Sequence, residues 1–172
     1  MIGSWKSLRK SGESFWSYLK PRLVALLEFI VAWLVLMRVM TGIHEDGHSY
    51  VDQLLGHPPG TIKTIYVHGF PIGGYYVPVS WEMPHWHLVA VALAGGLTVA
   101  LFFIYIDRYV HGRRGLDLAL NYWWAQQLTY SIGEALYFAM LAGEWMIYAF
   151  AFLGHLMGVL CVFLEVNGVV NV

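Results

Sequence analysis

The chain has little charge and almost no cysteine. Of its 172 residues, 12% are charged and 58% are hydrophobic, and Cys161 is the only cysteine. This composition excludes a soluble domain of this size and predicts an integral membrane protein in contact with a lipid bilayer. A single cysteine excludes an internal disulfide, and its apolar surroundings argue against thiolate ligation of a metal. The ten basic residues form no face interleaved with aromatic residues, which argues against nucleic-acid binding.

Four apolar stretches each approach the roughly 20 residues that a membrane helix needs. We predict an all-α membrane protein with spans at 21–43, 88–106, 116–141 and 146–166, in one membrane-embedded domain over 21–172. Residues 1–20 are predicted to form a basic amphipathic segment on the membrane surface, with a frayed basic tail as the alternative. No small-residue cleavage site follows the first span, which is therefore predicted to be an anchor.

The region between the first two spans, 57–84, predicts a small β-hairpin. Thr61–Val67 and Tyr75–Val79 are rich in β-branched and aromatic residues, and Phe70–Gly74 carries the turn signal between them. The hairpin is expected at the membrane surface.

Positive charge gathers in two segments that an even number of spans places on one side of the membrane. One segment precedes the first span, and the other joins the second span to the third. Their basic residues are Lys6, Arg9, Lys10, Lys20, Arg22, Arg108, Arg113 and Arg114. The distribution predicts that both termini are cytoplasmic.

The motif HEDGH follows the first apolar run. His44 and His48 are four residues apart, so on a helix both imidazoles lie on one face and can bind one cation. Glu45 lies beside them, where a carboxylate can act as general base and then general acid for a metal-activated water. Ionisable residues at membrane depth are costly, and the motif predicts a membrane-embedded zinc hydrolase site with Glu45 as its catalytic residue.

A third zinc ligand is expected from the third span. Gln127, Tyr130 and Glu134 fall at i, i+3 and i+7 and form a polar stripe in an apolar helix. At 1.5 Å per residue, Glu134 lies roughly 27 Å from Leu116 and His44 roughly 35 Å from Pro21, so their depths agree within helix tilt. We predict Glu134 as the ligand, with Gln127 and Tyr130 as supporting or oxyanion-stabilising groups.

Other interpretations of these side chains stay open at this point. Glu134 could be a structural hydrogen-bonded carboxylate, and His155, between Gly154 and Gly158, is the rival ligand or an interhelical hydrogen-bond partner. Asp52, one turn after His48, either orients that imidazole or is solvated. Arg38 is expected to reach the interface or to pair with Glu28 or Glu134.

The order HEDGH, GFPIGGYYVPV and ALAGGLTVALFF resembles the catalytic core of the site-two protease family of intramembrane zinc metalloproteases. The resemblance covers about His44 to Glu134. It implies one Zn²⁺ per chain and a membrane-protein substrate cleaved in or near a transmembrane segment. Members generally supply their third ligand as Asp in an N-P-x-x-x-L-D-G-like motif, whereas this chain has Ser131-Ile132-Gly133-Glu134, and AGG replaces an AGP-type motif.

The resemblance also implies that the glycine-rich stretch is an edge strand beside the metal. A membrane helix must unwind before it is cut, because its own hydrogen bonds shield the peptide carbonyls. The predicted strand could pair with the unwound segment through Gly73, Gly74, Tyr75, Tyr76 and Val77.

Three other functions compete with the protease. A non-catalytic membrane scaffold or zinc-binding protein of the same fold is the main alternative. A di-iron hydroxylase would need several histidine clusters, and a metal transporter would need more intramembrane carboxylates.

Gly154 and Gly158 predict helix packing, either within the chain or in a homo-oligomer.

Overall fold

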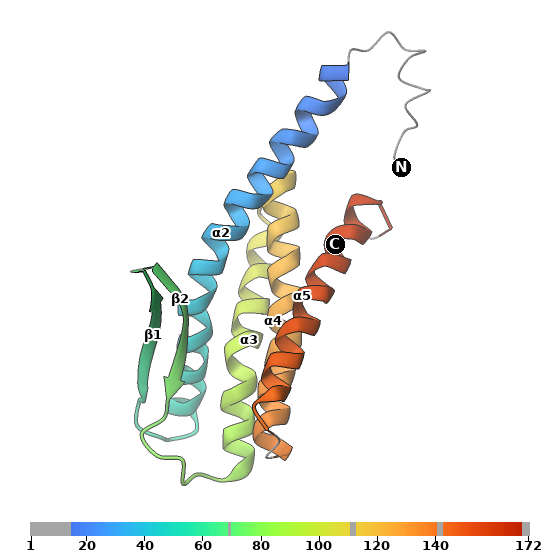
Figure 1. The fold of residues 1–172 in the computed structure, drawn as a ribbon. Helices are drawn as coiled ribbons and strands as arrows, with labels where there is room; N and C mark the ends of the chain where they lie inside the picture. Colours follow the sequence, from blue (N-terminus) through green and yellow to red (C-terminus); the bar gives the residue numbers. More distant parts are fainter. Residues whose placement is uncertain (1–14, 69, 111–112, 141–142, 170–172) are drawn as a thin grey trace.

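The computed structural model describes residues 15–68, 70–110, 113–140 and 143–169. In these ranges the chain forms four long helices and one hairpin, in the order α2 (Phe15–Leu54), β1 (Thr61–Val67), β2 (Phe70–Val77), α3 (His85–Asp107), α4 (Arg114–Met140) and α5 (Trp145–Val166). The helices run alternately up and down the bundle, so the start of α2 and the end of α5 lie at the same end (Figure 1). The predicted helical fold with a hairpin between the first two long helices is confirmed.

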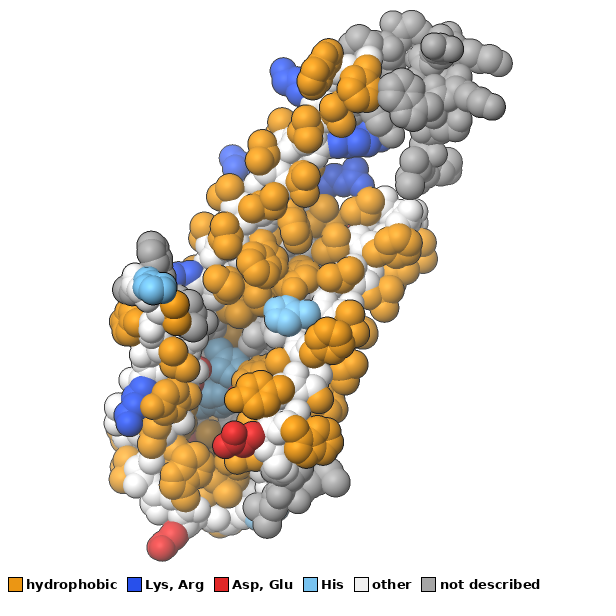
Figure 2. Space-filling model, viewed as in Figure 1, with side chains coloured by type: hydrophobic (Ala, Val, Ile, Leu, Met, Phe, Trp, Pro, Cys, Tyr) orange, Lys and Arg blue, Asp and Glu red, His pale blue; other side chains and the backbone are white. Residues whose placement is uncertain are grey.

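The predicted count of four membrane spans is not confirmed. Among the described residues, three helices, α2, α3 and α5, are long and apolar enough to cross a membrane by length and composition. The helix α4, with 27 residues, is longer than α3 and α5 but carries the buried polar side chains of Asn121, Gln126, Gln127 and Ser131, which lower its hydropathy. Apolar side chains cover the outer surfaces of α2 and α5 (Figure 2).

The helix α2 differs from the prediction at both ends. It begins at Phe15, passes through Pro21 and ends at Leu54, so it extends beyond the predicted span 21–43 on both sides and the HEDGH motif is wholly helical. Pro21 has no amide hydrogen, so the helix lacks one backbone hydrogen bond there. The helix ends in a Schellman cap. Gly56 adopts φ +88°, its amide donates to the Gln53 carbonyl, and the His57 amide donates to the Asp52 carbonyl. The rest of the predicted surface segment, residues 1–14, lies outside the described residues.

The hairpin has the predicted first strand and a different turn. The strand β1 spans Thr61–Val67 as predicted, whereas β2 begins at Phe70. The predicted turn at Phe70–Gly74 is therefore wrong: these residues are in the strand, and the chain reverses at His68, which has φ 49°. The register shifts between Ile65 and Tyr66, opposite Pro71, because proline cannot donate to the ladder and is accommodated at bulges.

The core lies where α3 and α4 meet α2. Val99 and Phe103 from α3 pack with Leu120, Tyr122 and Trp123 from α4. The Trp123 ring stacks on Trp33 of α2 at a centroid distance of 5.0 Å, and its Nε1–H donates to the Trp33 carbonyl at 3.1 Å. This packing fixes α4 against α2, and α2 in turn carries the hairpin.

Candidate metal site

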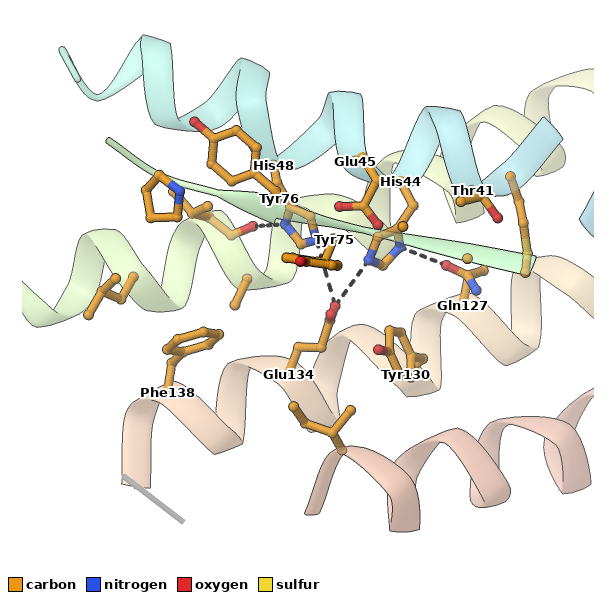
Figure 3. Close-up of a pocket in the computed structure, with 18 of the residues that line it drawn as sticks. Thr41, His44, Glu45, His48, Tyr75, Tyr76, Gln127, Tyr130, Glu134 and Phe138 are labelled. Atoms are coloured by element: carbon orange, nitrogen blue, oxygen red, sulfur yellow. Dashed lines mark hydrogen bonds and ion pairs between the residues drawn. The ribbon is translucent and has the colours of Figure 1, made fainter. Parts of the chain in front are cut away.

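Three side chains from two helices converge on one point. The Nε2 atom of His44 lies 3.3 Å from Glu134 Oε2, and the Nε2 atom of His48 lies 4.0 Å from the same oxygen. All three side chains can offer a ligand atom within 4.8 Å of one another, a group able to hold a metal ion. Figure 3 shows Glu134 pointing from α4 toward both imidazoles.

The two histidines share a helix face because α2 continues through the motif. Their rings lie 4.6 Å apart, centroid to centroid, and are nearly perpendicular. Both residues are buried, with 7% of their surface exposed. Residues four apart on a helix are neighbours, so the spacing in the sequence is the spacing in the site.

Each imidazole has one nitrogen already engaged. His48 Nδ1 lies 2.6 Å from the carbonyl oxygen of Val91, which can only accept, so this nitrogen carries the proton. His44 Nδ1 lies 2.9 Å from Gln127 Oε1, and Gln127 donates through its own Nε2 to Gln126 at 2.6 Å. Both Nε2 atoms are therefore left with a lone pair facing Glu134, the arrangement that metal-binding histidines require.

One oxygen of the Glu134 carboxylate lacks a hydrogen-bond donor. This atom, Oε2, is buried and has no hydrogen-bond partner among the described residues. A buried carboxylate oxygen without a donor is costly unless a cation compensates it. The unpartnered oxygen, facing two imidazole lone pairs, fits a bound metal ion.

Close approach of α3 completes the wall of the site. A Cβ atom at Gly95 would lie against His48 Nε2 and 2.7 Å from His44 Nε2. Position 95 therefore has to be glycine if the two nitrogens are to bind an ion. The small residues of the AGG stretch thus allow α3 to approach the ligands closely.

Glu45 is buried beside the ligands and is covered by the hairpin. It is 4% exposed, and its Oε2 has no hydrogen-bond partner among the described residues. A Cβ atom at Gly74 of β2 would lie 3.1 Å from Glu45 Cγ, so the strand passes directly over this side chain. Glu45 thus has a carboxylate oxygen available next to the three ligands.

A cavity of about 410 Å³ opens at these residues. Its wall includes His44, Glu45, His48 and Glu134, and the predicted strand residues Gly73, Gly74, Tyr75 and Tyr76. Gln127 and Tyr130 also line it, so the polar stripe of α4 faces the site as predicted. The Tyr130 ring lies 5.6 Å from that of His44. Val77 belongs to β2 but is not among the lining residues.

Asp52 has a different partner from the one predicted. It is fully buried and accepts a 2.5 Å hydrogen bond from the Tyr76 hydroxyl, which in turn accepts from the Gly60 amide at 2.8 Å. Burial and the Asp52 carboxylate raise the pKa of Tyr76 above its usual range, so the phenol stays a donor. Neither predicted role for Asp52 holds, because the Val91 carbonyl orients His48 and Asp52 is not solvated.

His155 lies away from the site. It is exposed on α5, and its Nδ1 lies 2.5 Å from the Tyr122 hydroxyl, so it is the interhelical partner of the two roles considered. Gly154 and Gly158 face Gln126 and Tyr122 of α4, which is packing within the chain. Self-association through these glycines stays a prediction.

Arg38 makes no ion pair with Glu28 or Glu134 in the described parts of the chain.

The remaining histidines make contacts outside the site. His57 Nε2 lies 2.7 Å from His87 Nδ1, and His85 Nε2 lies 2.9 Å from the Ala139 carbonyl. His68 forms the hairpin turn, and His111 lies outside the described residues. None belongs to a group of three metal-binding side chains among the residues that the structure describes.

Two features of the site escaped the sequence analysis. The Val91 carbonyl carries no signal, because every residue has one. The Tyr76–Asp52 contact joins residues 24 apart and depends on the strand register.

In comparisons with known proteins, no family model, curated protein or solved structure matches this chain.

Proposed function

We propose that this protein is an intramembrane zinc metalloprotease that hydrolyses a peptide bond in or near a transmembrane segment of a membrane protein. The observation that carries the proposal is the convergence of two imidazole Nε2 atoms on one carboxylate oxygen, Glu134 Oε2, that has no hydrogen-bond donor among the described residues and lies near Glu45. Three protein ligands with an open fourth position are typical of catalytic zinc.

The spacing of the ligand atoms suits zinc. Bonds of about 2.1 Å in a tetrahedral site place ligand atoms roughly 3.4 Å apart. The observed separations of 3.3 and 4.0 Å from Glu134 Oε2 to the two Nε2 atoms need only a small adjustment. Two imidazoles and one carboxylate provide a site for one Zn²⁺ per chain.

The burial of the polar groups on α4 supports membrane insertion of all four helices. Gln126, Gln127 and Ser131 are buried inside the bundle, and polar residues of membrane helices face such interiors. Four crossings place both termini on one side, and the basic residues near that end assign it to the cytoplasm. The metal site then lies in the other half of the bundle.

Zinc held by these ligands supplies Lewis-acid activation of water and of the scissile carbonyl. The Glu45 carboxylate takes up the proton that water loses and then delivers it to the leaving amide nitrogen. The Tyr130 hydroxyl, on the opposite wall of the cavity, donates to the carbonyl oxygen as negative charge develops on it.

The substrate enters as an extended segment along β2. This strand pairs with β1 on one edge only, and its Gly73–Tyr76 stretch lines the cavity. Strand addition satisfies the backbone groups that local unwinding of a substrate helix exposes. The same contact holds one peptide bond over Glu45.

The test uses the purified full chain, loaded with zinc and reconstituted in bicelles. It is incubated with a pool of synthetic single-span peptides, and products are identified by mass spectrometry. Wild type and Glu82→Gln, a change in an exposed loop, are expected to give the same products. Glu45→Gln is expected to retain zinc and to lose about 10²–10⁴-fold in rate.

Equal product from wild type and Glu45→Gln would end the hydrolase proposal. Zinc binding without cleavage of any peptide would favour the non-catalytic zinc-binding scaffold.

A further inference from the structure

The cavity beside the metal ligands has a polar half and an apolar half. The polar half contains the ligands, Glu45 and the α4 stripe. The remaining lining residues are mostly apolar and include Pro78, Trp81, Met83, Leu88, Phe138 and Ile147. These six are called the apolar half. These side chains come from the segment after β2 and from α3, α4 and α5, so four parts of the chain build the apolar wall.

One aromatic pair joins two of these parts. The Trp81 and Phe138 rings stack at a centroid distance of 6.0 Å and an interplanar angle of 15°. Phe138 is four residues after Glu134 on α4, so its ring lies about one helical turn, 5.4 Å, beyond the metal ligand on the same face. Figure 3 shows Phe138 beside Glu134. The apolar half therefore starts about one helical turn from the candidate ligand Glu134.

Resting on the function proposed above, we propose that this apolar half is a specificity pocket. It binds one large apolar side chain, aromatic or long aliphatic, of a substrate residue flanking the scissile bond, and Trp81 and Phe138 determine that selection. The volume of about 410 Å³ for the whole cavity is at the lower end of the roughly 300–1,000 Å³ typical of ligand sites. It accommodates an extended segment with one anchored side chain.

Charged side chains are excluded by the same lining. Among the described lining residues only Glu45 and Glu134 are acidic and none is Lys or Arg. Both carboxylates are committed to the reaction centre. A lysine or aspartate in the apolar half would lose its hydration without gaining a partner.

Trp81 is the residue of the apolar half that is best suited to substitution. It is 54% exposed and follows the end of β2, so its position depends on the stack with Phe138 more than on the core. Removing the indole would enlarge the pocket without touching a metal ligand. Adding an indole at Leu88, on the facing helix α3, would fill it.

The test measures binding apart from cleavage. The full chain carrying Glu45→Gln, loaded with zinc in bicelles, is titrated with fluorescein-labelled single-span peptides that differ at one central residue: Phe, Leu, Ala or Lys. Anisotropy gives the affinity for each peptide. The Phe-to-Ala ratio is the affinity for the Phe peptide divided by the affinity for the Ala peptide. This ratio is compared between each variant and the parent, so that differences in peptide partitioning cancel.

Phe and Leu peptides are expected to bind at least about 10-fold more tightly than Ala or Lys peptides. Trp81→Ala and Phe138→Ala should lower the Phe-to-Ala ratio several-fold, and Leu88→Trp should reverse the preference toward Ala. Trp16→Ala, at the exposed start of α2, is the matched control and should leave the ratio unchanged. Zinc content verifies that each variant keeps its site.

Equal Phe-to-Ala ratios in the parent, Trp81→Ala and Leu88→Trp would overturn the pocket assignment, even if wild type cleaves peptides. Failure of every peptide to bind would overturn it as well. Selective binding that tracks these three positions, without cleavage by wild type, would retain the pocket and reject the protease.

Discussion

The Tyr76 hydroxyl on β2 donates a 2.5 Å hydrogen bond to the Asp52 carboxylate on α2, one helical turn beyond His48. The Tyr76 ring also stacks on the His48 imidazole at a centroid distance of 6.3 Å. Asp52 is fully buried, and its other oxygen has no partner among the described residues. This contact therefore holds the hairpin against the helix that carries the metal ligands.

Replacing Tyr76 by phenylalanine should loosen the hairpin. The change leaves the buried Asp52 carboxylate and the Gly60 amide without their common partner, a cost of about 1–3 kcal/mol for such a group. The apparent melting temperature in detergent should fall by about 4–10 °C. Hydrogen exchange of the β2 amides should accelerate while that of α4 does not.

Tyr66→Phe is the matched control for this change. Tyr66 lies on the same hairpin and is 63% exposed, so loss of its hydroxyl should alter neither measurement. Equal melting temperatures for Tyr76→Phe and wild type would show that the contact does not hold the hairpin.

Gln127 should matter for metal affinity although it does not touch the ion. Its Oε1 accepts from His44 Nδ1 at 2.9 Å and so directs the free Nε2 toward Glu134. Removing such a partner typically costs 10–100-fold in metal affinity. Gln127→Ala is expected to weaken zinc binding by about that factor, measured by competition with a chelator.

Gln127→Glu keeps an acceptor at the same place and should retain most of the affinity. Gln53→Ala, an exposed glutamine bonded only to its own helix, should behave as wild type. A Gln127→Ala chain with wild-type affinity would mean that the Gln127 side chain does not orient His44.

The two histidines of the candidate site were accessible from the sequence because helix periodicity places them on one face. His44 and His48 share a face at i and i+4, and Gln127, Tyr130 and Glu134 share another at i, i+3 and i+7. Rough depth counting then places both faces at one level. The third ligand needed a tertiary assumption, the approach of α4 to α2, which the Trp33–Trp123 stack provides.

The errors in the predicted fold come from local rules that longer-range interactions override. Pro71, Gly73 and Gly74 are turn-formers, yet they lie in β2 because pairing with β1 accommodates the proline at a bulge. The first span was predicted from residue 21, yet α2 begins six residues earlier, at Phe15. The four-span count is not confirmed at α4, because polar side chains that turn inward lower the hydropathy of this helix.

Glu134→Ala should abolish stoichiometric zinc binding. The change removes the carboxylate that faces both Nε2 atoms, leaving two imidazoles, one ligand short of a catalytic zinc site. Zinc per purified chain, measured by elemental analysis, should fall from about one to well below one.

Two control variants separate Glu134 from its rivals. Glu144→Ala removes an exposed glutamate at the start of α5, and His155→Ala removes the exposed partner of Tyr122. Both should keep one zinc per chain. Full zinc in Glu134→Ala together with zinc loss in His155→Ala would move the third ligand to α5.

A single methyl group at Gly95 should empty the site by steric occlusion. The added Cβ would lie against His48 Nε2 and 2.7 Å from His44 Nε2, where the ion has to be. Alanine otherwise favours a helix interior by about 1 kcal/mol over glycine, so the loss cannot be ascribed to helix propensity. We expect Gly95→Ala to weaken zinc binding at least about 100-fold in chelator competition.

Gly42→Ala tests the same chemical change on α2, two residues before His44, where a Cβ atom would have no neighbour within 4 Å. It should bind zinc as wild type does, and circular dichroism should show the same helix content for both variants. If Gly95→Ala also binds zinc normally, α3 cannot lie as close to the two imidazoles as the geometry requires. The approach of α3, which makes the site a closed three-helix centre, would then be wrong. Zinc loss confined to Gly95→Ala would instead show that the ion lies between the HEDGH face of α2 and the glycine face of α3.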